Sequence, residues 1–132
     1  MNFLKQLGFS GRFQALRLGF IVNETKISPC VYEMIKELLA KDIDFMILDI
    51  KKIYRIDAGY FDLIIVDHLV QEIYEFIDQW IFLIVGKGLL LSIIENTNKV
   101  NHPALPLIFR GTVQISLNPD KTCQGFIYQN DN

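Results

Sequence analysis

The sequence predicts an α/β protein of one domain, in which a mixed sheet carries a central parallel β-α-β unit and a C-terminal β-hairpin. Two nearly continuous apolar runs, residues 45–50 and 81–85, are typical of strands that are covered on both faces. A long segment between them has helical period. Near the C-terminus, two strand-like runs flank a glycine-containing pair. The length of 132 residues fits a single domain, 1–132.

The N-terminal part is expected to form a strand followed by a helix. Residues 13–22, FQALRLGFIV, are rich in apolar side chains and predict a strand. Ser28 and Pro29 then resemble a helix start, with Ser28 as the N-cap and Pro29 at the first helical position. Apolar residues follow at helical spacing until Lys41.

The central unit is expected to run through residues 45–85 as strand, helix and strand, with a right-handed crossover. The helix is predicted after Asp57, because apolar residues fall on one broad face when each residue is placed about 100° further round the axis. That face comprises Ile65, Val66, Leu69, Val70, Ile73, Phe76 and Ile77.

The C-terminal third is expected to begin with a helix and to end in strands. Leu89 to Asn96 are predicted to begin another helix. The runs PLIFR and VQISL flank Gly111-Thr112, a pair that suits a two-residue hairpin turn. Residues 125–129, GFIYQ, are expected to add a last short strand.

Composition narrows the class of protein. The formal net charge of −2 argues against strong nonspecific binding to nucleic acid, which requires a basic surface. The N-terminus lacks the apolar core of a signal peptide, and residues 80–94 are too short to span a membrane, so a cytoplasmic location is expected. Cys30 and Cys123 lie far apart in the sequence, which predicts two reduced thiols.

The step Asp57-Ala58-Gly59 lies where the predicted strand pattern ends and the helix pattern begins. The carboxylate of Asp57 can accept a backbone N–H of the first helical turn, and its negative charge suits the positive end of the helix. The step is therefore predicted to start the helix. It also lies at the carboxyl end of a predicted parallel strand, where α/β sheets often bind ligands and partners.

The pattern ILDIKKIYRIDAGYFDLI resembles the STAS domain, which is found in sulfate transporters and anti-sigma factor antagonists. That family has an apolar strand ending in Asp, a short connector, and then Ile-Asp-Ser-Ser-Gly opening a long helix. Ile47-Leu48-Asp49 match the strand end, and Ile56-Asp57 match the start of the motif. The resemblance covers residues 13–100. It implies a STAS-like core within residues 1–100 and diverged strands in residues 101–132.

The sequence departs from that family at the position of its phosphorylated serine. Ala58 and Gly59 stand there, and neither carries a hydroxyl group. The resemblance therefore implies a regulatory protein that is not switched by serine phosphorylation at this loop. Phosphorylation of the Tyr60 hydroxyl at this loop is left open.

A partner-binding surface is predicted at the start of the long helix. Tyr60, Phe61 and Ile64 project away from the apolar face of the predicted helix, and such a group can mark an interaction patch. The segment from Ile56 to Gly86 contains six acids and no Lys or Arg, so the outer helix face is either a solvated surface or a docking surface for a basic partner. The predicted partner-binding residues are Asp57, Ala58, Gly59, Tyr60, Phe61 and Ile64.

Basic residues suggest an alternative site at one edge of the sheet. Lys51, Lys52 and Arg55 precede the predicted helix start, and Lys87 follows the next strand. A helix N-terminus with nearby cations can hold a phosphate or carboxylate. A module that binds a nucleotide or an organic phosphate is therefore the alternative function.

No motif for catalysis or metal binding is recognised in the sequence. His68 and His102 lack a second ligand at metal spacing, and His68 beside Asp67 is expected to be a helix-surface pair. We therefore predict a non-enzymatic regulatory module that binds another protein and needs no cofactor or metal. Two alternative functions are left open, an immunity-type protein and an accessory enzyme subunit. Self-association into a homo-oligomer is also left open.

Overall fold

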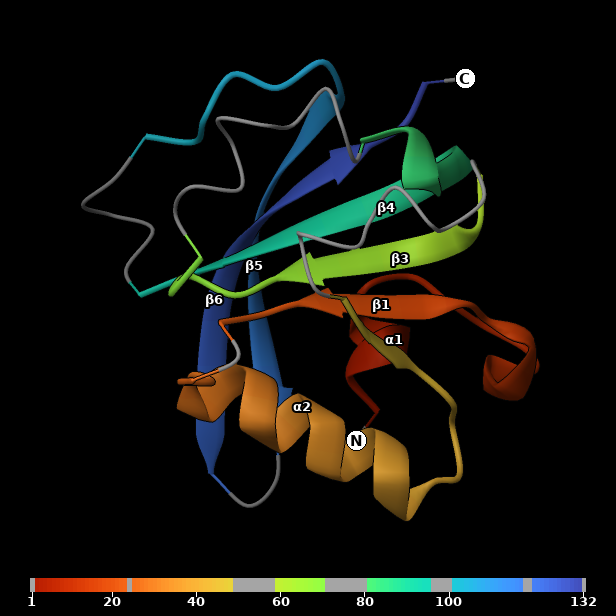
Figure 1. Ribbon diagram of the computed structural model, residues 1–132, viewed down its shortest axis with the longest axis vertical. Coiled ribbons are helices and arrows are strands. Elements are labelled where there is room, and N and C mark those ends of the chain that lie inside the picture. Colours follow the sequence, from red (N-terminus) through yellow and green to blue (C-terminus); the bar gives the residue numbers. More distant parts are fainter. Residues whose placement is uncertain are drawn as a thin grey trace.

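Six strands form one mixed sheet in the computed structural model of the chain, in the order β2-β1-β3-β4-β6-β5 (Figure 1). The structure describes residues 2–23, 25–48, 59–70, 81–95, 101–117 and 120–131. The strands are β1 (Leu18–Ile21), β2 (Met46–Leu48), β3 (Phe61–Val66), β4 (Ile84–Ile94), β5 (Ile108–Leu117) and β6 (Lys121–Gln129). The described helices are α1 (Phe3–Gln6) and α2 (Pro29–Ala40), with 3-10 turns at Phe13–Ala15 and Ile81–Leu83. The predicted α/β class is confirmed.

The strands β2, β1, β3 and β4 run parallel to one another in that spatial order. β1, α2 and β2 form a β-α-β unit. The prediction placed this unit at residues 45–85 instead, but β1 and β3 separate β2 from β4 in the sheet. The C-terminal β6 is antiparallel to both β4 and β5 and lies between them.

The start of α2 forms as the sequence predicts. Ser28 has an extended backbone, and its side chain accepts a hydrogen bond from the backbone N–H of Val31 at 3.3 Å. Pro29 follows at the start of the helix, where its missing N–H would have no helical partner. Val31, Met34 and Leu38 are buried along one side of the helix, as the apolar spacing requires.

The two faces of the sheet pack into separate cores. The first core joins α1 and α2 to the sheet and comprises Phe3, Leu4, Leu7, Leu18, Phe20, Val22, Val31, Met34, Leu38, Ile43, Leu63, Ile65, Leu91, Ile93, Ile115, Leu117 and Cys123. The second core comprises Ile21, Leu48, Phe61, Ile64, Val66, Val70, Leu83, Ile84, Leu90, Phe126 and Tyr128. Leu105 and Leu107 pack against this second core. The segment 101–107 also accepts a hydrogen bond there, from the Tyr128 hydroxyl to Pro103 O at 2.7 Å.

The predicted long helix is wrong for residues 61–66, which form strand β3. Leu63 and Ile65 pack in the first core, whereas Ile64 and Val66 pack in the second. A strand that is buried on both faces is apolar at every position, so an apolar run of this length fits both helical and strand periods. Residues 71–80 of the predicted helix lie outside the described residues.

The predicted helix at residues 89–96 is wrong for the part described, because β4 continues to Ile94. The predicted turn at Gly86-Lys87-Gly88 is an irregularity within β4, whose pairing with β3 jumps from Ile84 to Leu89. A Cβ at Gly88 would lie 2.7 Å from Ile84 Cγ2 and 2.9 Å from Val85 O, so only glycine fits the backbone conformation at this position. β4 therefore continues through this irregularity instead of ending at a turn.

The C-terminal hairpin is confirmed, but its turn lies elsewhere. β5 and β6 pair antiparallel from Ile108↔Gln129 to Leu117↔Lys121. Gly111 lies at a register shift inside β5 with φ of 121°, a conformation that glycine adopts readily. The predicted Gly111-Thr112 turn is therefore a bulge. The short strand predicted at residues 125–129 is the end of β6.

A disulfide joins Cys30 of α2 to Cys123 of β6, with their Cα atoms 5.8 Å apart. The prediction of two reduced thiols is therefore wrong, because 93 residues of sequence separate partners that the fold brings together. Disulfides persist mainly in oxidising compartments, so this pair gives no support to a cytoplasmic location. Within the described ranges, no helix is both long and apolar enough to cross a bilayer.

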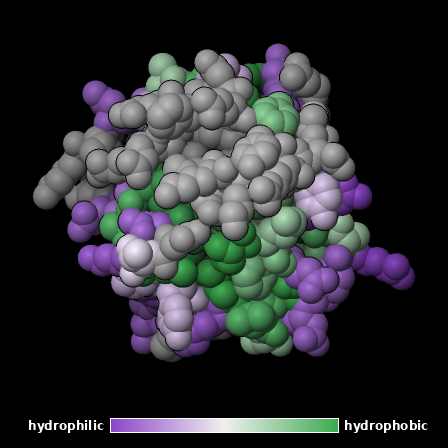
Figure 2. Space-filling view, in the orientation of Figure 1, coloured by the Kyte–Doolittle hydropathy of each residue, from purple (hydrophilic) through white to green (hydrophobic). Residues whose placement is uncertain are grey.

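Some large apolar side chains are exposed on the described surface. Met46 and Ile47 on β2 are 41% and 47% exposed, and Leu39 on α2 is 63% exposed. Figure 2 shows that apolar residues gather in the lower half of the face it presents. β2 is an outer strand of only three residues, which limits its pairing with a strand of another molecule.

Candidate functional site

The carboxyl ends of β1 and β3 mark the point where the order of the sheet reverses. After β1 the chain continues through α2 to β2 on one side, whereas β3 is followed by β4 on the other side. In open α/β sheets, ligands bind outside the carboxyl ends of the strands at such a switch point. This carboxyl edge lies on the left of Figure 1, where α2 also begins.

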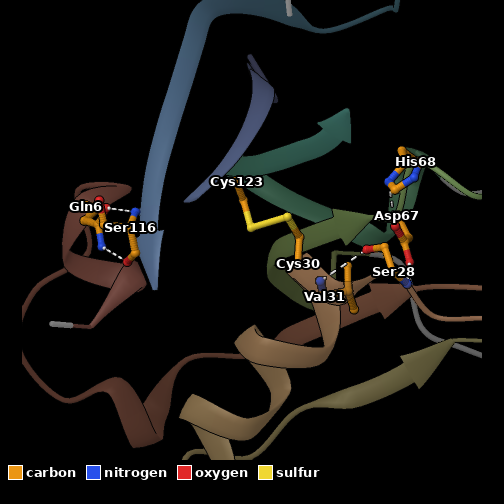
Figure 3. Close-up of a disulfide and its surroundings, with 8 residues drawn as sticks. All are labelled: Gln6, Ser28, Cys30, Val31, Asp67, His68, Ser116 and Cys123. Carbon is orange, nitrogen blue, oxygen red and sulfur yellow. Dashed lines mark hydrogen bonds and ion pairs between the residues drawn. A yellow bond between two sulfur atoms is a disulfide. The ribbon is translucent and has the colours of Figure 1, made fainter. Parts of the chain in front are cut away.

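Asp67 follows β3 at this edge and is 1% exposed. Its Oδ2 accepts a hydrogen bond from the backbone N–H of Ser28 at 2.8 Å, and its own N–H donates to Ile21 O at 3.0 Å. Figure 3 shows Asp67 and Ser28 directed toward one another across the start of α2. Asp67 therefore fixes the end of β3 against both the end of β1 and the start of α2.

The second carboxylate oxygen of Asp67 has no hydrogen-bond donor in the described structure. Its Oδ1 lies 3.4 Å from His68 Nδ1, and both atoms are buried without a hydrogen-bond partner. The His68 side chain as a whole is 27% exposed. Because Nδ1 is buried, that exposed part belongs to the other atoms of the side chain. A buried carboxylate oxygen is costly to leave unpaired, and it has two lone pairs, so Oδ1 can accept both from His68 and from a ligand.

The loop between β1 and α2 begins and ends beside Asp67, which is hydrogen-bonded to Ile21 before the loop and to Ser28 at its end. Asn23 Oδ1 accepts hydrogen bonds from Thr25 N at 3.0 Å and from Thr25 Oγ1 at 2.8 Å. Lys26 N donates to Asn23 O at 3.2 Å, and the side chains of all three residues are exposed. The segment 23–28 contains no glycine. The loop is therefore a tight turn that presents polar side chains at the edge.

The predicted partner-binding residues that the structure describes do not lie at this site. Asp57 and Ala58 lie outside the described residues, so the predicted cap is not described. Gly59 and Tyr60 precede β3 and lie at the opposite, amino edge. Phe61 and Ile64 are fully buried, so the premise that they form an exposed apolar group is wrong. Both side chains belong to the second core, because β3 replaces the predicted helix surface.

The predicted anion-binding residues are also separated from the carboxyl edge where the structure describes them. Lys51, Lys52 and Arg55 lie outside the described residues. Lys87 lies near the amino end of β4, and its Nζ is 3.6 Å from Asp131 Oδ1. The strand that precedes Lys51 ends at Leu48, at the carboxyl edge. The predicted grouping of Lys87 with Lys51, Lys52 and Arg55 therefore stays a prediction.

The structure describes two acids of the predicted acidic helix face, Asp62 and Asp67, and neither lies on a helix. Asp67 is buried at the end of β3, and Asp62 within β3 accepts the backbone N–H of Arg17 at 2.9 Å. Sequence reasoning missed Asp67 because it treated this residue as part of a helix surface. The signal was present: an acid directly follows the apolar run FDLIIV, as Asp49 follows FMIL.

No protein-family model matches the sequence, and no curated protein matches it. Two solved structures resemble the fold. The tRNA (m1A58) methyltransferase TrmI from Aquifex aeolicus has 12% sequence identity and a TM-score of 0.50, over 90% of this chain and 64% of that chain. The N-methyltransferase NodS from Bradyrhizobium japonicum WM9 has 13% identity and a TM-score of 0.50, over 98% of this chain and 90% of that chain. The chain thus spans less than two thirds of the length of TrmI, and at these identities the likeness concerns the fold.

These neighbours correct the STAS resemblance, because the fold is similar to that of methyltransferases. The predicted STAS-like regulatory module and the expectation of a protein without enzymatic activity are corrected by the same finding, since both neighbours are enzymes. The resemblance failed where it assigned a helix to residues 61–66, which form the strand β3. The motif that it placed at a helix start lies before this strand.

Proposed function

We propose that this chain is an enzyme that transfers a methyl group from S-adenosylmethionine, and that its site lies at the carboxyl edge beside Asp67 and His68. The fold similarity to two methyltransferases supports the reaction class. We choose this site because the Oδ1 of Asp67, at the switch point, is buried and unpaired. A polar atom in that position has a physical reason to bind a donor, and the carboxyl edge is where α/β sheets hold ligands.

The polar groups at this edge suit the hydroxyl, amino and carboxyl groups of the cofactor. Asp67 Oδ1 can accept a hydrogen bond from a ribose hydroxyl or an amine, and Asn23 and Thr25 offer side-chain donors and acceptors on the neighbouring loop. Because segment 23–28 contains no glycine, side chains rather than closely approached backbone provide the contacts of this loop. When bound, the cofactor supplies an electrophilic methyl group on a sulfonium.

His68 takes the proton that an N–H or O–H acceptor loses when it is methylated. An Nδ1–H directed at Asp67 Oδ1, 3.4 Å away, leaves Nε2 as the proton acceptor of the ring. Asp67 orients the imidazole through this contact, since the carboxylate itself is fixed by the Ser28 N–H. Asp67 is in this way a positioning residue and His68 the base.

Isothermal titration calorimetry with S-adenosylhomocysteine tests the proposal. Asp67→Asn keeps an oxygen that can accept the Ser28 N–H but removes the negative charge, so affinity should fall at least about tenfold. Asp62→Asn is the matched control, because Asp62 lies on the same strand and also accepts a backbone N–H, but at the amino edge. Its affinity should equal that of the wild type. Absence of saturable binding to the wild type, or equal affinity of the two folded variants, would refute the proposed site.

A further inference from the structure

A cavity lies at the amino edge of the sheet, away from Asp67. It has a volume of about 260 Å³ and is formed where the chain enters β1, β2 and β3. Its wall includes Leu16, Arg17, Asp44, Phe45, Met46 and Tyr60. Tyr60, one of the predicted partner-binding residues, is partly accessible and lines this cavity. The volume lies just below the range of about 300–1,000 Å³ that is usual for ligand pockets and suits a molecule of about one ring.

Arg17 supplies a fixed positive charge on the wall of this cavity. Its guanidinium lies over the ring of Tyr60, 4.8 Å from the ring centroid. Its backbone is held on both sides, since Arg17 N donates to Asp62 Oδ2 and Asp62 N donates to Arg17 O, each at 2.9 Å. The carboxylate of Asp62 is thus used by the backbone, and no described carboxylate forms an ion pair with the guanidinium. Its donors are available to an anion.

Aromatic rings give the cavity flat, well-supported walls. Phe45 packs edge-on against Phe20 with ring centroids 5.6 Å apart, and Tyr60 packs edge-on against Phe61 at 4.8 Å. Phe20 and Phe61 are fully buried, so they anchor the two wall residues. A flat ring that stacks on Phe45 or Tyr60 buries apolar surface and gains from aromatic contact.

Asp44 limits the charge that the cavity accepts. It lines the same cavity and is exposed. A carboxylate near the binding site disfavours a second negative charge on the ligand, so a phosphate ester or a dicarboxylate fits less well than a monoanion. Arg17 disfavours a ligand that carries only a positive charge.

We propose that the amino-edge cavity binds a small aromatic monocarboxylate, with the carboxylate on Arg17 and the ring against Phe45 and Tyr60. Both oxygens of a carboxylate match the two parallel N–H donors of a guanidinium, which Tyr60 already orients. This site is independent of the proposed methyl transfer, because it uses none of the residues at the carboxyl edge.

Titration of the full chain with benzoate, followed by backbone amide NMR, tests this site. Saturable shifts should centre on Arg17, Phe45 and Tyr60, and benzylamine should not reproduce them. Arg17→Met should weaken benzoate binding at least about tenfold, because a charge-assisted, bidentate contact is lost. Arg17→Lys keeps the positive charge but lacks the two parallel N–H donors of a guanidinium, so its affinity for benzoate should be intermediate.

Arg12→Met is the matched control, since Arg12 is an exposed cation that does not line the cavity. Its benzoate affinity should equal that of the wild type. The proposal is overturned if Arg17→Met and Arg12→Met bind benzoate equally, or if the wild type shows no saturable shifts at this cavity. Benzylamine binding with the same shifts would also overturn it. S-adenosylhomocysteine binding is measured separately, so failure of one site leaves the other test intact.

Discussion

Reduction of the Cys30–Cys123 disulfide should destabilise the protein by several kcal/mol. The bond joins the first turn of α2 to β6 across a sequence separation of 93 residues. Opening a covalent loop of that length gives the unfolded chain much more conformational freedom. Chain-entropy arguments assign about 4.7 kcal/mol at 25 °C to a loop of about 100 residues, and native disulfides commonly contribute about 2–5 kcal/mol.

Urea unfolding with and without a phosphine reductant measures this effect. With an m-value of about 2 kcal/mol/M, a loss of about 4 kcal/mol moves the midpoint down by about 2 M urea. Cys30→Ala/Cys123→Ala is the control, because its midpoint should not respond to the reductant. Cys123 is 1% exposed within the first core, so this variant also loses some packing. Its urea midpoint should therefore be somewhat lower than that of the reduced wild type.

Two results would refute the reasoning. One is an intact mass, measured without reductant, that matches two free thiols. The other is a wild-type midpoint that the reductant leaves unchanged. Either would mean that α2 and β6 are held together by packing alone.

Three further predictions concern single residues. Burial raises the pKa of Glu37 above its ordinary value of 4.5, so the ionised form disfavours folding and stability falls as pH rises through the window above 4.5. Glu37→Gln keeps an acceptor for the Phe3 N–H and should raise Tm by about 1–3 °C at neutral pH, with no gain in calorimetry well below pH 4.5. Ser28→Ala removes the N-cap bond to Val31 N and should lower the free energy of unfolding by about 1 kcal/mol in urea; no loss would count against the cap. His68→Gln should lower the rate of methyl transfer about 10²–10⁴-fold and leave S-adenosylhomocysteine affinity unchanged, whereas an unaltered rate would exclude His68 as the base.

Local signals in the sequence predicted a substantial part of the fold. The start of α2 followed from the adjacent Ser28 and Pro29, because capping depends on residues close in the chain. The C-terminal hairpin followed from two alternating runs that are near neighbours. By contrast, residues 61–66 fit both a helical and a strand period, because each face of β3 packs in its own core. Whether this run forms a helix or a strand depends on its pairing with β1 and β4.

The candidate site could not be predicted because it is assembled from residues distant in sequence. Asp67 and Ser28 are 39 positions apart and meet only because β3 pairs with β1. Likewise, Cys30 and Cys123 meet only because β6 inserts beside β4. Pairing across the sheet is a tertiary property, which sequence periodicity does not encode.

Backbone amide NMR with S-adenosylhomocysteine tests the central claim most directly, because it locates the ligand on the sheet. The carboxyl-edge site predicts that the largest shifts fall on Asn23, Ser28 and His68, with little change at Arg17 and Tyr60. Shifts centred on Arg17 and Tyr60, or no shifts at saturating ligand, would contradict it.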